Sequence, residues 1–126
     1  MIKRNVYLDG MLVVAQCTDT LSSEELNNHV AWLVRSFGEL IKPGFSHLFI
    51  AIDANTDSLT EDDIRHIAHI NISFAKTRGE FTTAIVANEP YPISLAHLHK
   101  ILSKVSNINV EIFNNISSAY KWLGYE

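Results

Sequence analysis

The sequence has 126 residues, 47% of them hydrophobic and 19% charged, which is the size and composition of one globular domain and not of a disordered chain. Ten lysine and arginine residues against fourteen aspartate and glutamate residues give a formal net charge of −4, which argues against a surface that binds nucleic acid or anionic membranes. Because Cys17 is the single cysteine, an internal disulfide and every cysteine-based zinc signature are excluded.

The first predicted unit is a β-hairpin. Residues 5–8 and 11–17 are rich in β-prone side chains, and Asp9-Gly10 lies between them. Both turn residues tolerate positive φ angles, so this dipeptide predicts a two-residue type I′ turn. The apolar residues of the second run indicate a strand that is covered on much of both faces.

A helix is predicted next. Ser22 and Glu25 have the spacing of a capping box at its start, and Pro43-Gly44 is expected to end it. Residues 45–53 then have the near-continuous hydrophobicity of a central parallel strand. The apolar stripe of the helix is Leu26, Val30, Leu33, Phe37 and either Leu40 or Ile41.

The second helix is predicted to follow a polar loop. Thr60 is the expected N-cap, and the acidic residues 61–63 come directly after it, where carboxylates meet the positive end of the helix dipole. Arg78-Gly79 is expected to end this helix. The side expected to be buried carries Ile64, Ile67, Ala68, Phe74 and Ala75.

The remaining elements continue the alternation of strand and helix. Residues 81–87 and 109–113 are predicted strands, Pro90-Tyr91-Pro92 starts a third helix, and Asn115 or its neighbours cap a short last helix. The third helix is expected to bury Leu95, Leu98, Leu102 and Val105, and the last one carries Ala119, Trp122 and Leu123.

The predicted element order is therefore ββαβαβαβα, in a single domain that spans residues 1–126. This alternation indicates an α/β fold with a mixed, mainly parallel sheet, opened by the β-hairpin and with helices packed on the sheet. The apolar runs are far shorter than the roughly 20 residues of a transmembrane helix, and the chain start lacks the apolar stretch of a signal peptide. We therefore expect a cytoplasmic protein with no membrane insertion.

The histidines offer one candidate metal site. His66 and His69 are three residues apart on the second helix, next to Asp62 and Asp63, and a metal-dependent enzyme built on these residues is one hypothesis. Their side chains fall opposite the apolar stripe, where they are expected to be solvated. A zinc or iron site also needs at least three ligands that meet at one point. The sequence indicates no third histidine near these two.

Two other patterns are not expected to bind metal. His97 and His99 are two residues apart on a helix, so they point to nearly opposite sides. The segment that starts at Asp53 matches the first half of a calcium loop, but its sixth residue is Ser58 and its twelfth is Ile64, where glycine and glutamate are needed. The sequence therefore predicts no metal and no cofactor.

No catalytic motif is present in the sequence. There is no Gly-x-Ser-x-Gly elbow, Walker loop or Gly-x-Gly-x-x-Gly motif, and Cys17 is interpreted as a small hydrophobic strand residue. We expect the apolar residues to be buried in the strands and in the helices that connect them. Ionisable side chains from distant segments should then stay dispersed and not meet in a sheltered hollow. The prediction is a protein that is not an enzyme.

The crevice beyond the carboxyl ends of the strands is the expected site for a ligand or a partner, because open α/β sheets bind ligands there. The polar residues at this edge are also common turn formers, so loop chemistry alone explains them as well. The candidates are Asp53, Asn55, Thr56, Ser58, Asn88, Tyr91 and Asn114, with Glu89 and Asn115 beside them.

Aromatic residues indicate a possible second contact surface. Trp32 lies near the polar boundary of its helix. Together with Tyr120, Trp122 and Tyr125 it would contribute to an exposed patch for self-association into a homodimer. Helices packed at their edges give the same pattern, so both interpretations stay open.

The second half of the chain resembles a known family. Residues 81–88 look like the strand after the second helix in the SpoIIAA-like superfamily, which includes the STAS domains of sulphate transporters and anti-sigma factor antagonists. Residues 110–124 resemble the ending of uncharacterised bacterial members, in which a strand with a phenylalanine leads to an Ala-x-x-Trp-Leu helix. Here these residues are Phe113, Ala119, Trp122 and Leu123. The resemblance implies a SpoIIAA-like fold.

The resemblance also implies a function. Known members are mostly protein-binding regulators without catalytic machinery, which implies a non-catalytic regulatory module here. Anti-sigma antagonists are phosphorylated on serine in an Asp-Ser-x-Gly turn. The comparable turn contains Asp57 and Ser58, with Thr60 in place of the glycine, which makes Ser58 the candidate for phosphorylation. The alternative is a small-molecule or lipid-binding domain that uses the strand-end crevice or a pocket between the hairpin and the helices. It would need an apolar cavity of at least about 300 Å³ with convergent polar groups.

Overall fold

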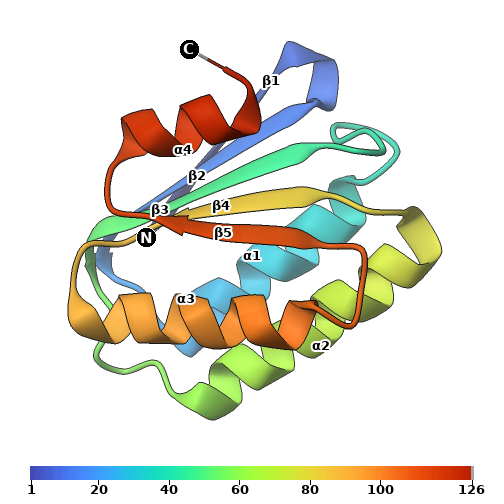
Figure 1. Ribbon diagram of the computed structural model, residues 1–126. Helices are drawn as coiled ribbons and strands as arrows, with labels where there is room; N and C mark the ends of the chain where they lie inside the picture. Colours follow the sequence, from blue (N-terminus) through green and yellow to red (C-terminus); the bar gives the residue numbers. More distant parts are fainter. Residues whose placement is uncertain (126) are drawn as a thin grey trace.

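The computed structural model describes residues 1–125, which form one five-stranded sheet and the helices that cover it (Figure 1). The strands are β1 (Ile2–Tyr7), β2 (Leu12–Thr20), β3 (Ser46–Asn55), β4 (Thr82–Val86) and β5 (Asn109–Phe113), and the helices are α1 (Ser23–Ser36), α2 (Glu61–Arg78), α3 (Pro90–Ser103) and α4 (Ile116–Leu123). The sheet order is β1-β2-β3-β4-β5, with β1 antiparallel to β2 and every other pair parallel. The predicted element order and α/β class are confirmed.

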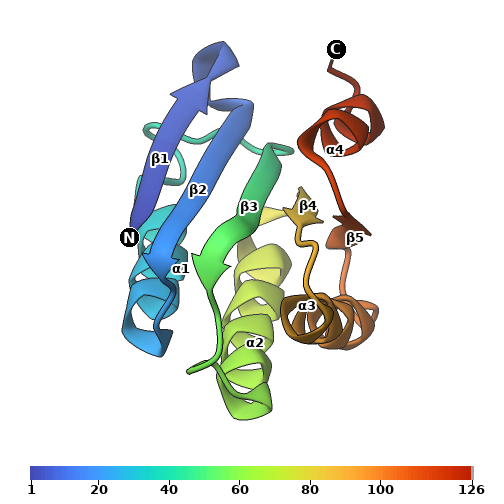
Figure 2. The ribbon, with the colours of Figure 1, turned by 90° about the vertical axis from the view of Figure 1, so that its left-hand side faces the viewer.

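The sheet has a helical layer on each face. Figures 1 and 2 show α1, α2 and α3 together on one face and α4 alone on the other. Alternate side chains of β3 pack against the two helical layers, because successive residues of a strand point to opposite faces of the sheet. Leu48 and Ile50 belong to the buried cluster on the α4 side, whereas Phe49 packs with the cluster that includes Leu26, Ile64 and residues of α3. Each face therefore has its own apolar core.

Local capping signals set the helix starts. Ser22 Oγ accepts a hydrogen bond from the Glu25 N–H group at 3.1 Å. Thr60 and Asp63 form a complete capping box at the start of α2, and Asn115 Oδ1 accepts from the Ser118 N–H group at 2.8 Å. These caps satisfy N–H groups that have no partner within their own helix. The starts of α1, α2 and α4 were thus readable from short sequence motifs.

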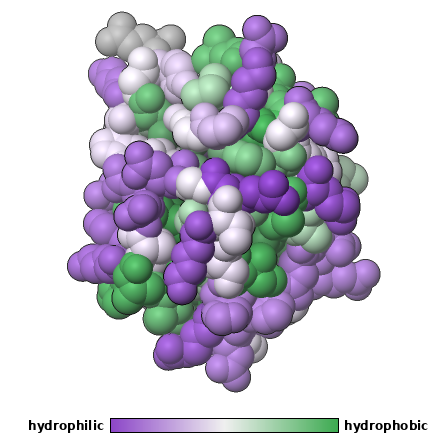
Figure 3. All heavy atoms as spheres, turned by 90° about the vertical axis from the view of Figure 1, so that its right-hand side faces the viewer, coloured by the Kyte–Doolittle hydropathy of each residue, from purple (hydrophilic) through white to green (hydrophobic). Residues whose placement is uncertain are grey.

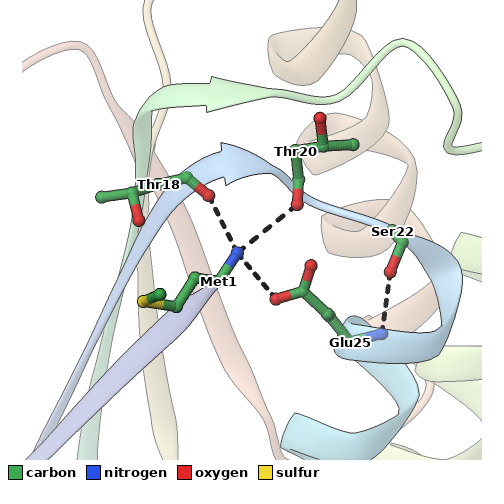
Figure 4. Close-up of polar contacts among 5 residues, drawn as sticks. All are labelled: Met1, Thr18, Thr20, Ser22 and Glu25. Atoms are coloured by element: carbon green, nitrogen blue, oxygen red, sulfur yellow. Dashed lines mark hydrogen bonds and ion pairs between the residues drawn. The ribbon is translucent and has the colours of Figure 1, made fainter.

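Glu25 does not complete a capping box, because its carboxylate binds the start of the chain (Figure 4). The α-amino group of Met1 lies 2.7 Å from Glu25 Oε2, and it donates to the backbone oxygens of Thr18 at 2.9 Å and Thr20 at 3.4 Å. Asp19, between these two residues, has a φ of 58°. The contacts tie the beginning of β1 to the end of β2 and to the first turn of α1.

The predicted two-residue hairpin turn is wrong. Tyr7 pairs with Leu12, so residues 8–11 connect the strands, and Leu8 and Asp9 as well as Gly10 have positive φ angles. The loop is shaped by a distant segment, because the Lys42 N–H group donates to the Gly10 oxygen at 3.0 Å. Tertiary packing therefore overrides the local Asp-Gly turn preference.

Helix α1 ends at Ser36, before the predicted stop at Pro43-Gly44 and before Leu40 and Ile41, which were expected on its apolar stripe. Phe37 is already extended, and Gly38 has a φ of 90°. The Gly38 N–H group donates to the Ile41 oxygen at 2.8 Å, so the chain folds back and buries Ile41 while Leu40 stays exposed. Ile41 is buried from a turn and not from the helix. Its place in the helical spacing of apolar residues therefore made the predicted helix too long.

Helix α3 is rotated relative to the prediction. Leu95 is buried as expected, but Ala96, His99 and Ser103 share its buried face. Val105 lies beyond the helix and is 81% exposed. Apolar periodicity missed this face because small and polar residues make up most of it.

The proposed aromatic patch does not exist as one surface. Trp32 packs at the edge of the core on the α1 side of the sheet. Trp122 lies in α4 on the opposite face, with its ring centroid 5.6 Å from that of Phe113. None of the helices within residues 1–125 combines the length and the apolarity needed to cross a membrane.

Candidate functional site

An apolar cavity lies between the sheet and helices α1, α2 and α3. We call it the inner cavity, and its volume is about 90 Å³. Phe49 and Ile85, which pair across the central strands β3 and β4, line it and keep part of their surface accessible. The apolar lining also includes Ala51, Val30, Ile67 and Leu95. The volume is well below the 300 Å³ expected for a small-molecule site.

Three histidines from distant segments line the inner cavity: His29 on α1, His47 on β3 and His99 on α3. All three are buried. The prediction that ionisable groups stay dispersed and do not gather in a sheltered hollow is therefore wrong. Helices α1 and α3 lie on the same face of the sheet (Figure 2), so their histidines line one cavity together with His47.

His29 and His47 are linked by a chain of hydrogen bonds. Arg4 Nε donates to His29 Nδ1 at 2.9 Å, and His29 Nε2 lies 3.0 Å from His47 Nε2. His47 Nδ1 lies 3.4 Å from Thr83 Oγ1. The chain crosses from the edge strand β1 through α1 to the central strands β3 and β4. The rings of Trp32 and His29 are stacked, with their centroids 6.1 Å apart.

His99 has its own polar partners. Its Nε2 lies 3.1 Å from Asn71 Nδ2 on α2, and its Nδ1 lies 3.5 Å from Ser103 Oγ one turn further along α3. Both nitrogens of each buried histidine thus have a neighbour. No buried side-chain nitrogen or oxygen among residues 1–125 lacks a hydrogen-bond partner.

Burial keeps these histidines neutral. Removal from water lowers the pKa of His47 to about 3, with His99 adding a smaller effect, and lowers the pKa of His99 to about 4. The pKa of His29 is well below its ordinary value, chiefly through burial and further through His47 and Arg4. A charged imidazole would be poorly solvated in this apolar lining.

Cys17 is buried in β2, as the sequence predicted. Burial raises the pKa of its thiol to about 12, so that the reactive thiolate form is strongly disfavoured. The residue is part of the apolar cluster between the sheet and the helices.

The polar residues predicted at the strand ends do not form one site. Thr56 is buried and lines the inner cavity, whereas the Tyr91 hydroxyl donates to the Leu59 oxygen. Asn55 Oδ1 accepts from the Asp57 N–H group at 2.9 Å, which is an ordinary turn contact. The side chains of Asp53, Ser58, Asn88 and Asn114 are exposed.

A shallow groove lies at the carboxyl ends of β4 and β5. We call it the strand-end groove; it has a volume of about 310 Å³ and is open to solvent. Asn114 is the one predicted candidate that lines it, beside His97 from α3 and Ser118 from α4. The opposite end of the molecule, shown in Figure 3, has hydrophobic residues in separate patches among hydrophilic ones.

The histidines of the candidate metal site lie where the sequence placed them. His66 and His69 are exposed on α2, and His97 is exposed on α3. Asp63 is engaged by the Thr60 cap and accepts a hydrogen bond from Ser23 Oγ at 3.0 Å. Within residues 1–125, no group of three or more histidine, cysteine, aspartate or glutamate side chains is arranged to hold a metal ion.

The sequence contained a signal for the buried histidines. His47 lies within the apolar strand run, where a solvated residue is not expected. His29 follows Leu26 by three residues, and His99 follows Leu95 by four, so each lies on the buried stripe of its helix. If histidine is counted among the core residues, the sequence pattern predicts that all three histidines are buried. It does not predict that they line one cavity.

Comparison with known proteins supports the fold. No protein-family model and no curated protein matches the sequence. A crystal structure of an uncharacterized protein of the DUF3478 family from Shewanella loihica PV-4, described as having a SpoIIAA-like fold, is similar over 98% of this chain and 92% of its own, with a TM-score of 0.58 and 14% identity. The chain therefore has a SpoIIAA-like fold, as its second half indicated.

Proposed function

We propose that this protein is a non-catalytic cytoplasmic binding module that holds a small apolar ligand in the inner cavity. The observation that carries the proposal is the cavity itself, which lies inside a buried apolar layer between the sheet and three helices. Pockets with a largely apolar lining and a few polar groups are the usual form of a small-molecule site. The alternative considered from the sequence is a different site, because it places the ligand in the strand-end crevice or between the hairpin and the helices and needs at least about 300 Å³.

The chemistry of the cavity supports binding over catalysis. The ring nitrogens of His29, His47 and His99 are already engaged by neighbouring side chains. The lowered pKa values of His47 and His99 keep these rings neutral near pH 7. A general base needs a free nitrogen within reach of the substrate proton, and none of these rings offers one.

The size of the cavity limits the ligand. A cavity of about 150 Å³ in another protein accepts benzene, and the inner cavity has about 90 Å³. The expected ligand therefore has only a few non-hydrogen atoms, or is the end of one lipid chain whose remainder stays outside.

Thiophene, a small apolar ring, is a suitable probe. We expect its addition to shift the methyl NMR signals of Ile85 and Ala51, which line the cavity. Ala51→Val adds two carbon atoms to the lining and should weaken thiophene binding at least about tenfold, because the larger side chain fills part of the cavity. Ala54→Val is the matched control, since Ala54 lies on the same strand but outside the lining. Equal binding by both variants, or no thiophene binding by the wild type, would rule out this site.

A regulatory role through protein contacts is the second candidate function. Ile101 is 60% exposed and Val105 is 81% exposed near the end of α3, and they are the residues at which contact with a second copy of the chain is tested. Ser58 is exposed in the turn before α2, so its hydroxyl is accessible to a kinase. Mass spectrometry of protein from its native cells tests for phosphate at Ser58.

A further inference from the structure

The hydrogen bonds between Arg4 and Thr83 run in one direction. An arginine side chain only donates, and a neutral histidine carries one ring proton. Because Arg4 Nε donates to His29 Nδ1 at 2.9 Å, the proton of His29 is on Nε2. This proton points to His47 Nε2 at 3.0 Å, which places the proton of His47 on Nδ1, facing Thr83 Oγ1 at 3.4 Å.

The same reasoning fixes the third ring. Asn71 Nδ2 is an amide nitrogen and can only donate, and it lies 3.1 Å from His99 Nε2. The proton of His99 is therefore on Nδ1, facing Ser103 Oγ at 3.5 Å. Each of the three rings is held in one tautomer and has no free nitrogen.

We infer that Arg4 determines the ligand specificity of the inner cavity, because it fixes the tautomers of His29 and His47 and so leaves the cavity without a free histidine donor or acceptor. The histidine rings then offer a ligand only their faces, so the cavity favours uncharged ligands that form no strong hydrogen bonds, with Thr56, Asn71 and Thr83 as the other polar residues of its lining. This inference rests on the proposed binding function. Arg4 acts as a positioning residue, since it reaches the cavity only through His29.

The physical reason is desolvation. A ligand with an N–H or O–H group loses its hydrogen bonds to water on entry and gains none from the rings, which costs roughly tenfold or more in affinity. A ligand without such groups has no comparable loss. A positively charged histidine pair would change this selection. The neighbouring guanidinium of Arg4 and the apolar lining both disfavour that charge.

The tautomers can be measured without any ligand. A long-range ¹H–¹⁵N NMR spectrum of the imidazole rings at pH 7 should show His29 with its proton on Nε2, and His47 and His99 with theirs on Nδ1. The exposed His69 on α2 is the internal control. A proton on His29 Nδ1, or a charged His29–His47 pair, would overturn the inference whether or not the cavity binds a ligand.

Ligand selection is tested with two rings of equal size. Thiophene lacks strong hydrogen-bonding groups, whereas pyrazole is neutral and has one donor and one acceptor. Wild-type protein should bind thiophene at least about tenfold more tightly than pyrazole. Arg4→Met keeps a long apolar stem but removes the donor, so His29 can change tautomer and the preference should fall at least about threefold. Lys3→Met, on the same strand and exposed, should keep the wild-type preference.

The outcomes separate the inference from the proposed function. Binding of thiophene with equal binding of pyrazole would overturn the specificity inference and leave the binding function standing. An unchanged preference in Arg4→Met would likewise overturn the role of Arg4. A lack of thiophene binding would reject the proposed function and, with it, the specificity.

Discussion

At the scale of single residues, the most consequential feature is a set of neutral histidines in the core. His29, His47 and His99 are buried with hydrogen-bond partners on both ring nitrogens. In the unfolded chain the same side chains are solvated and have pKa values near 6.5. Folding therefore changes their proton affinity, and the stability of the protein depends on pH.

The sign of this dependence follows from the lowered pKa values of His47, about 3, and His99, about 4. Between about pH 6.5 and pH 4 the unfolded chain binds more protons than the folded protein, so the free energy of unfolding falls as the pH falls. Each buried histidine contributes up to about 1.4 kcal/mol per pH unit in this range. Above pH 7 the contribution is constant.

Urea denaturation at several pH values between 7.5 and 4.5 measures this effect. His47→Gln removes one titrating group and should reduce the slope of the unfolding free energy against pH by about 1.4 kcal/mol per unit. His69→Gln, at an exposed histidine of α2, is the matched control. An unchanged slope in His47→Gln would contradict the neutral, buried state of His47.

At the scale of elements, contacts between distant segments determine the shape of the connections. The loop between β1 and β2 packs against residues 40–42, and a Cβ atom at Gly10 would overlap the Leu40 carbonyl group. Gly10 also has a φ of 91°, which a side chain disfavours. The hairpin connection is thus specified from outside the hairpin.

Gly10→Ala should lower the free energy of unfolding by about 3 kcal/mol, because it adds both backbone strain and steric overlap. Gly44→Ala is the matched control. Gly44 has a φ of 78°, but a Cβ atom there meets no other atom within 4 Å, so we expect a loss of only about 1 kcal/mol. Equal losses in chemical denaturation would show that the contact with Leu40 contributes nothing.

At the scale of the whole molecule, the two faces of the sheet have different surroundings. Helix α4 covers one face by itself, while α1, α2 and α3 lie together on the other (Figures 1 and 2). The inner cavity lies between these three helices and the sheet. The exposed apolar side chains near the end of α3, Ile101 and Val105, lie outside both cores. They are available for contact with a second molecule.

Sedimentation velocity over a range of concentrations tests self-association through this surface. We expect the wild type to form dimers as its concentration rises, and a double variant with Ile101→Ser and Val105→Ser to remain monomeric, because the apolar area that would be buried is lost. Leu40→Ser, at an exposed apolar residue in the loop after α1, should behave as the wild type. A wild type that stays monomeric throughout would reject the homodimer.

The sequence by itself determined the features that depend on neighbouring residues. The caps at Ser22, Thr60 and Asn115, the strand and helix order and the burial of Cys17 all follow from short motifs or from runs of apolar residues. Such signals act over a few residues, so they can be recognised in the sequence without knowledge of the tertiary structure. The likeness of the second half to SpoIIAA-like proteins was also legible, and it correctly indicated the fold.

Only the tertiary structure decided the hairpin loop, the end of α1, the buried face of α3 and the candidate site. His29, His47 and His99 are far apart in the sequence and meet because two helices pack on the same side of one sheet. The strand-end residues, by contrast, share an edge of the sheet without converging on one point. Convergence depends on the angles and distances at which whole elements pack, and local sequence patterns do not contain these quantities.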